Sequence, residues 1–123
     1  ETKNNSLRRI LFLFTLFVPL QCLFGQEARQ YSFTHYSVSN GLAAYNTGNA
    51  IQDDQGYIWI GTANGLQRFD GSRFLTFRHD PNDKNSLPDN SVWQLLYDKQ
   101  QNLWVLLSNG SIGIFDTRRF IFK

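Results

Sequence analysis

Aspartates are the residues in this sequence with the clearest chemical potential, and four of them recur beside turn residues. Asp53 and Asp98 are separated by 45 positions, and Asp70 and Asp116 by 46. Paired carboxylates can act as general acid and base. An Asp beside a turn more commonly accepts hydrogen bonds from backbone N–H groups. Because all four recur at matched positions, we interpret them as turn residues and expect no catalytic residue here.

The other candidates for metal or phosphate chemistry are incomplete. His35 and His79 are the two histidines and stand far apart in the sequence, whereas a zinc site needs three or four ligands. Residues 80–85 resemble a calcium loop, but Lys84 occupies a ligand position and no suitably spaced Gly or Glu follows. The sequence has no glycine-rich phosphate loop or nucleophile elbow. We expect neither a metal nor another cofactor.

Tryptophan is the residue type best suited to contact a sugar, because its ring can stack on an apolar face. Trp59 and Trp104 occupy matching positions 45 residues apart, so we assign both to packing between repeated units. Trp93 has no such counterpart, because Gly48 stands at the matching position. Trp93 is therefore our candidate ligand contact.

A repeat of about 45 residues organises the chain. Segments 53–65 and 98–110 match at an offset of 45, and one inserted residue shifts the offset to 46, which also matches Phe74 with Phe120. Such a period, with several strands per unit, is typical of β-propeller blades. The repeat signature, which we interpret as structural, comprises Asp53, Gly56, Trp59, Gly61, Thr62, Gly65, Leu66, Phe69, Asp70, Asp98, Trp104, Gly110, Phe115 and Asp116.

Short runs rich in aromatic and β-branched residues, separated by Asn-Gly and Asp-Gly turns, predict strands throughout the repeat. We therefore predict an all-β fold, a β-propeller fragment of about two four-stranded blades after an N-terminal signal segment. A lone strand near 31–36 could complete the last blade of a closed propeller. The expected strands lie near 47–52, 57–62, 65–69 and 73–77 in the first unit, and near 91–97, 103–107, 111–115 and from 119 onward in the second.

The expected organisation begins with a signal peptide over residues 1–26. Basic residues precede the apolar run 10–18, and the small Gly25 stands before the expected cleavage site. The run is short for a membrane span of about 20 residues, and an uncleaved anchor is the alternative. Residues 27–46 form an N-terminal strand and lead-in, 47–80 the first blade, and 81–123 a truncated second blade.

Cysteine content excludes a disulfide-stabilised fold, and charge excludes nucleic-acid binding by this segment. Cys22 is the only cysteine and lies in the expected signal peptide, so the mature chain has no disulfide. The bulky Gln21 stands before Cys22, where a lipoprotein cleavage site needs a small residue, so we do not expect lipidation. From Glu27 onward, nine acidic residues balance nine basic ones. No basic stripe is present to follow a phosphate backbone, so we expect no nucleic-acid binding by this segment.

The repeat resembles the two-component regulator propeller repeat. The resemblance extends over residues 31–123, and its motifs in the first unit are residues 40–42, 52–62 and 64–71. The second unit is degenerate. It has Gln101-Asn102 where a Gly turn is expected, Leu106-Leu107 where Gly-Thr is expected, and Ser111 where Leu is expected.

This resemblance implies an extracytoplasmic sensor. Proteins of this kind continue through further blades, an immunoglobulin-like connector and one membrane span to a histidine kinase, a receiver and often a DNA-binding region. The resemblance implies a periplasmic propeller in a full-length protein anchored in the cytoplasmic membrane. We expect this protein to be a homodimer and to bind a small molecule or an oligosaccharide. No kinase motif lies in the present chain, so no residue here is assigned kinase activity.

Two alternatives remain open because a fold does not fix a function. The first is an exported propeller enzyme, such as a polysaccharide lyase or hydrolase, with its catalytic residues on other blades. The second is a secreted carbohydrate-binding or adhesion propeller without a signalling role.

Overall fold

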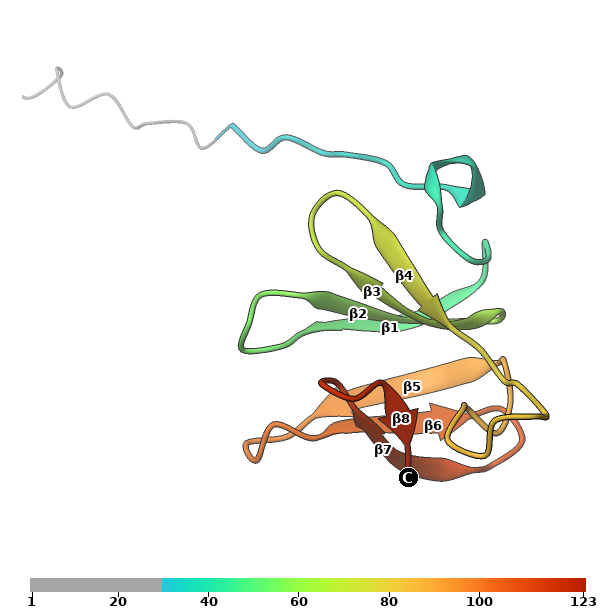
Figure 1. The fold of residues 1–123 in the computed structure, drawn as a ribbon. Helices are drawn as coiled ribbons and strands as arrows, with labels where there is room; N and C mark the ends of the chain where they lie inside the picture. Colours follow the sequence, from blue (N-terminus) through green and yellow to red (C-terminus); the bar gives the residue numbers. More distant parts are fainter. Residues whose placement is uncertain (1–29) are drawn as a thin grey trace, which may run out of the picture. The chain divides into compact units, whose positions relative to one another are not determined.

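The computed structural model describes residues 30–123, and the expected signal peptide lies outside the described residues. Eight strands form two four-stranded antiparallel sheets, each with its strands in sequential order (Figure 1). The predicted all-β fold with two four-stranded units is therefore confirmed. The first sheet contains β1 (Thr47–Gln52), β2 (Ile58–Thr62), β3 (Gly65–Phe69) and β4 (Phe74–Phe77), and the second contains β5 (Val92–Tyr97), β6 (Leu103–Leu107), β7 (Ile112–Asp116) and β8 (Ile121–Phe122).

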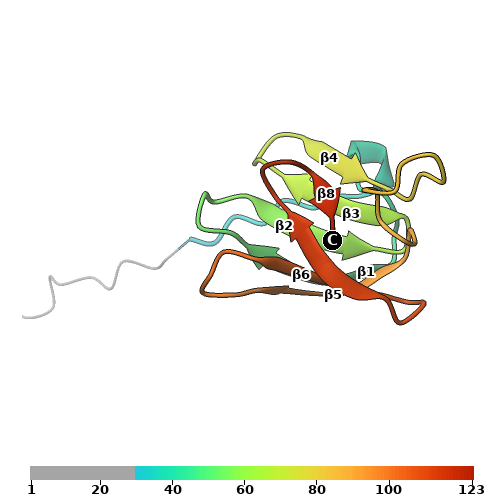
Figure 2. The same ribbon diagram turned by 60° about the horizontal axis from the view of Figure 1, so that its bottom comes forward.

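The two sheets pack face to face, as Figure 2 shows from a second direction. On β6, Leu103, Val105 and Leu107 are fully buried and alternate with half-buried residues, as the period of two in a pleated strand requires. The ring of Trp59 on β2 lies 5.7 Å from that of Phe115 on β7 and 5.9 Å from that of Phe77 on β4. The buried apolar core comprises Trp59, Leu66, Leu87, Val92, Leu95, Leu103, Val105, Leu107 and Phe115.

The inner strands β1 and β5 approach each other closely. The Asn49 side-chain amide donates to the Leu95 carbonyl, and the Leu95 N–H donates to Asn49 Oδ1, both at a distance of 2.7 Å. Beside this pair, a Cβ added to Gly48 would lie only 2.4 Å from the Trp93 carbonyl oxygen. A glycine at position 48 therefore permits the approach, and the Asn49 amide holds the two strands together.

The segment expected to form a lone strand near 31–36 does not form one, since residues 30–36 have no regular structure. A strand exists only where a neighbour supplies a ladder of hydrogen bonds, and none of the described strands does so. A 3-10 turn, Val38–Asn40, follows this segment. The ring of Tyr36 packs at 4.9 Å from Phe69 and 5.6 Å from Phe74, on the first sheet.

The match of Phe74 with Phe120 at an offset of 46 is wrong. Phe69 pairs with Phe74 across β3 and β4, whereas Phe115 pairs with Phe122 across β7 and β8. The counterpart of Phe74 is therefore Phe122, because the turn in the second unit is longer. Phe120 lies in that turn with a φ of 59°, and its ring packs 5.0 Å from Phe77.

Candidate functional site

The first of the four recurrent aspartates closes a turn and holds an indole ring. Asp53 is buried between β1 and β2, and its Oδ1 accepts hydrogen bonds from the backbone N–H groups of Gln55 and Tyr57 at 3.0 and 2.9 Å. Its Oδ2 accepts one from Nε1 of Trp59 at 2.8 Å. Every oxygen of this carboxylate is thus committed to the scaffold.

Asp98 repeats the arrangement in the second sheet. It accepts from the N–H groups of Gln100 and Asn102 and, through Oδ2, from Nε1 of Trp104 at 2.8 Å. The Asn102 side chain adds a donor at 2.9 Å. These bonds, with the Asn102 side chain foremost, lower the pKa of Asp98 from 3.8 to about 2 because they favour the charged form.

Asp70 and Asp116 occupy the turns before β4 and β8. Asp70 accepts from the N–H groups of Ser72 and Arg73. Asp116 accepts from those of Arg118 and Arg119, and it pairs with the Lys123 ammonium at 3.1 Å. The pKa of Asp70 is lowered chiefly by the Arg73 N–H, and that of Asp116 chiefly by the Arg119 N–H. These two carboxylates therefore serve turns as well.

The remaining signature residues also occupy scaffold positions. Gly65 shows why glycine is needed after β2, since its φ is 120° and an added Cβ would lie 2.5 Å from the Phe77 carbonyl oxygen. Thr62 donates from Oγ1 to the Gly65 carbonyl at 2.8 Å and closes this turn. The others are placed as follows: Gly56 and Gly110 in turns, Gly61 against Val92, Leu66 and Phe115 in the core, Phe69 beneath Tyr36, and Trp104 half-buried on β6.

Trp93 lies apart from these residues, at the start of β5, with 69% of its surface exposed. It lines a hollow of about 460 Å³ where β1 and β5 begin, which we call the Trp93 hollow. The rim is held by backbone hydrogen bonds from Ala63 to Asn46 and from Ser108 to Ser91. The lining consists of Asn46, Thr47, Gly48, Ala63, Ser91, Val92, Trp93 and Ser108.

The composition of the Trp93 hollow favours a neutral polar ligand. It combines one exposed indole ring with the hydroxyl groups of Ser91 and Ser108 and the amide of Asn46, and none of its lining residues is charged. An indole can stack on a sugar ring, while hydroxyl and amide groups can donate to and accept from sugar hydroxyls. Among residues 30–123, no three His, Cys, Asp or Glu side chains are placed to hold a metal ion.

A second hollow, of about 380 Å³, lies where the β1–β2 and β5–β6 turns meet. Here the Tyr97 hydroxyl donates to Asp54 Oδ1 at 2.7 Å, and the Gln101 side-chain amide donates to Oδ2 of the same carboxylate. Burial, followed by the hydrogen bond to Asp54, raises the pKa of Tyr97 to about 12. The sequence does not predict this contact between the sheets, although Gln101 stands where the repeat has a Gly.

Comparison with known proteins finds the same family model in both repeat units. Residues 41–64 and 86–109 match the family model described as two component regulator propeller. A "Histidine kinase P4" of Formosa agariphila is 30% identical over 77 residues, which are 63% of this chain and 6% of that protein. The chain thus spans about one-sixteenth of the length of this curated relative.

One solved structure is similar in part. It is an extracellular domain assigned to a hybrid two component system of B. thetaiotaomicron, with 20% sequence identity and a TM-score of 0.38. The match covers 73% of this chain and 19% of that one. Among residues 30–123, no helix is both long enough and apolar enough to span a membrane.

Proposed function

Since the chain carries two copies of the two component regulator propeller repeat, we propose that it is part of the extracytoplasmic ligand-sensing region of a hybrid histidine kinase. The similarity to a histidine kinase over 77 residues supports this proposal. The sensing region would lie on the periplasmic face of a protein anchored in the cytoplasmic membrane, assembled as a homodimer. The kinase would reside in parts of the polypeptide beyond these residues.

The ligand we propose is a neutral oligosaccharide bound in the Trp93 hollow. The single observation that carries this assignment is the exposed Trp93 ring beside the uncharged hydroxyl and amide groups of the hollow. The hollow lies across the junction of the two sheets, at the start of β1 and β5. A ligand there would contact both sheets at once, so it could favour one relative placement of the blades. Only such differential binding can shift a conformational equilibrium.

The four recurrent aspartates give no support to an enzymatic role for these residues. Each carboxylate accepts at least two hydrogen bonds from its own turn, and two of them also hold indole rings. A general acid or base needs a carboxyl group within reach of the substrate. An enzymatic role would therefore not rest on these four carboxylates.

Titration with neutral oligosaccharides, followed by calorimetry and by tryptophan fluorescence, tests the ligand site. We expect saturable binding by the sensing region. An aromatic contact is worth about 0.5–1.5 kcal/mol, so Trp93→Ala should weaken binding about two- to tenfold. Tyr45→Ala is the matched control, because Tyr45 is 82% exposed and does not line the hollow. Equal affinity of Trp93→Ala and the parent protein would exclude this site.

The signalling role requires a separate measurement on the full-length protein. We expect an oligosaccharide that binds the propeller to change the rate of autophosphorylation in membrane vesicles. The Trp93→Ala variant should retain the basal rate and need more ligand for the same response. Binding without any change in phosphorylation would favour a binding propeller with no signalling role.

A further inference from the structure

Arg68 on β3 carries a positive charge where the two sheets meet, and it has no counter-ion. The side chain is half-buried, and its Nε atom is buried without a hydrogen-bond partner. The single ion pair among residues 30–123 joins Lys123 to Asp116, so no described carboxylate neutralises Arg68. Buried polar groups and charges are normally paired, because the loss of hydration penalises an unpaired one. An arginine in this state is therefore a candidate binding site.

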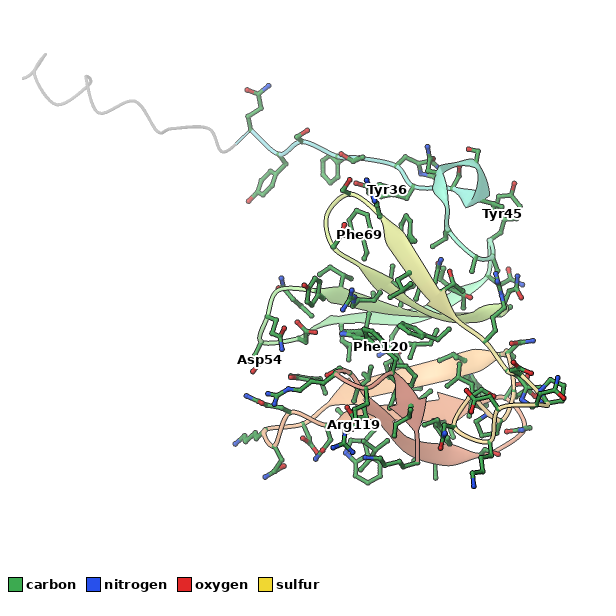
Figure 3. The ribbon with its side chains drawn as sticks, in the orientation of Figure 1. Tyr36, Tyr45, Asp54, Phe69, Arg119 and Phe120 are labelled. Carbon is green, nitrogen blue, oxygen red and sulfur yellow. The ribbon has the colours of Figure 1, made fainter. Side chains whose placement is uncertain are left out.

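Two aromatic rings hold the guanidinium group of Arg68. Its Cζ atom lies 4.2 Å from the ring centroid of Tyr57 and 5.3 Å from that of Phe120. The Asp53 turn fixes Tyr57, whose N–H donates to Asp53 Oδ1 at 2.9 Å. Phe120 lies between the two sheets, with its ring 5.0 Å from that of Phe77 (Figure 3). Aromatic rings attract a cation but provide no oxygen acceptor, so the guanidinium group is held in place while its N–H donors stay available.

This group of three residues is not repeated in the second sheet. By the registers of the two sheets, Ile114 is the counterpart of Arg68. At an offset of 45, Asn102 is the counterpart of Tyr57. Phe120 lies in the turn that is longer in the second unit, with a φ of 59°, and a bulky residue keeps such a φ only where the surrounding structure imposes it. Residues that serve only the shared fold recur in both units, so this departure favours a role in recognition.

The charged residues near this group favour an anion. Asp70, two residues after Arg68, accepts hydrogen bonds from two N–H groups of its own turn and forms no ion pair with any residue that the structure describes. In the turn before β8, Asp116 is neutralised by Lys123. The Arg118-Arg119 pair in the same turn is exposed and adds two positive charges. The excess of positive charge favours a ligand with more than one negative group.

We propose that Arg68 binds an oxyanion, namely the carboxylate or sulfate group of an acidic oligosaccharide. A guanidinium group presents its N–H donors in a planar fork, which can meet two oxygens of either group at once. Arg68 is not among the lining residues of the Trp93 hollow, so the two sites are separate. The oxyanion chemistry rests on the surroundings of Arg68, whereas the choice of a saccharide rests on the proposed sensing role.

Titrations of the full-length protein in detergent test the site, with tri-galacturonic acid, a sulfated carrageenan tetrasaccharide and neutral maltotriose as probes. The parent protein should bind at least one acidic probe, more weakly as the salt concentration rises. Arg68→Gln should weaken this binding about tenfold or more, because it removes hydrogen bonds to a charged group. Arg68→Lys should also weaken it, because lysine lacks the planar fork.

Arg73→Gln is the matched control, since it removes the same charge from an exposed position on the first sheet and should leave the affinity unchanged. Binding of neither acidic probe by the parent protein would overturn the proposal. Equal affinity of Arg68→Gln and the parent protein for the acidic probes would overturn it as well.

A second comparison separates this site from the Trp93 hollow and does not depend on the folding of an Arg68 variant. Trp93→Ala should leave the affinity for the acidic probe unchanged, and maltotriose should not compete with that probe. Loss of acidic binding in Trp93→Ala, or competition by maltotriose, would overturn the proposal by placing both ligands in the Trp93 hollow.

Two further outcomes separate the parts of the proposal. Weaker acidic binding by Arg68→Gln, without binding of any neutral oligosaccharide, would support the Arg68 site and count against the ligand proposed for the Trp93 hollow. Binding of a tri-glutamate peptide that depends on Arg68 and is tighter than that of both acidic saccharides would overturn the choice of a saccharide.

Discussion

The indole N–H of Trp59 donates to Oδ2 of Asp53 at a distance of 2.8 Å, and Trp104 and Asp98 form the same hydrogen bond at the same distance. A single carboxylate therefore holds both the turn that follows the inner strand and the indole ring of the tryptophan on the next strand. Asp and Trp, six positions apart in the sequence, function as one unit in each sheet.

Replacement of Asp53 by Asn should separate these two roles. The variant keeps an oxygen for the turn amides but directs an NH₂ group at the buried indole N–H of Trp59. An unsatisfied buried donor costs about 1–3 kcal/mol, so we expect the free energy of unfolding to fall by about that amount. Urea unfolding measures it. A double-mutant cycle with Trp59→Phe should show coupling, and strict additivity would contradict the proposed unit.

Acid should weaken the second sheet through Asp98. The hydrogen bonds to Asp98 lower its pKa from 3.8 to about 2 in the folded protein. The stabilisation is complete above pH 3.8 and declines as the pH falls toward 2, because the unfolded state then binds more protons. The stability difference between the parent protein and Asp98→Asn should shrink over this range. Thermal unfolding at several pH values measures it, and a constant difference would contradict the assignment.

The approach of the inner strands should be sensitive to one methyl group. A Cβ at position 48 would lie 2.4 Å from the Trp93 carbonyl, whereas one at position 61 would lie 2.9 Å from the Val92 Cγ1. Backbone cannot move aside as a side chain can, so we expect Gly48→Ala to cost about 1–3 kcal/mol and Gly61→Ala less. Chemical unfolding of both variants measures the two losses of stability. A larger loss for Gly61→Ala than for Gly48→Ala would contradict the prediction.

Gln101 combines a backbone strain with a useful contact. Its φ is 66°, where its counterpart Gly56 has 88°, and its side chain donates to Asp54 of the other sheet. Gln101→Ala keeps the strain and loses the bond, so it should lower stability by about 1 kcal/mol. Gln101→Gly loses the bond but relieves the strain, so it should be close to neutral. If both variants lost the same free energy of unfolding, the positive φ at position 101 would have no measurable cost.

Features set by neighbouring residues could be predicted from the sequence. The strands and the turn role of Asp53 follow from residue types a few positions apart, and the two four-stranded units follow from the repeat of about 45 residues. The bond from Trp59 to Asp53 could not be foreseen, because it depends on which way the ring turns within the sheet. The contact of Asp54 with Tyr97 and Gln101 requires the relative placement of two sheets, which no local pattern specifies.

The error at Phe120 has a similar origin. A bulky residue rarely adopts a positive φ, so nothing in its type indicates that Phe120 lies in a turn rather than in a strand. The sequence offset could not detect the longer turn. Only the register of β7 with β8, in which Phe115 pairs with Phe122, reveals it. The strand expected near 31–36 does not form, because none of the described strands pairs with that segment.

The pairing of Asn49 with Leu95 bears on how the repeats can diverge. The Asn49 amide contacts the N–H and carbonyl of the opposing residue and makes no demand on its side chain. A substitution at position 95 that keeps the N–H would therefore keep these two hydrogen bonds, while the buried Leu95 side chain still has to fit the core. The two repeats can therefore diverge in the side chains of their exposed faces, such as that of Leu96, without loss of the hydrogen bonds that join the sheets.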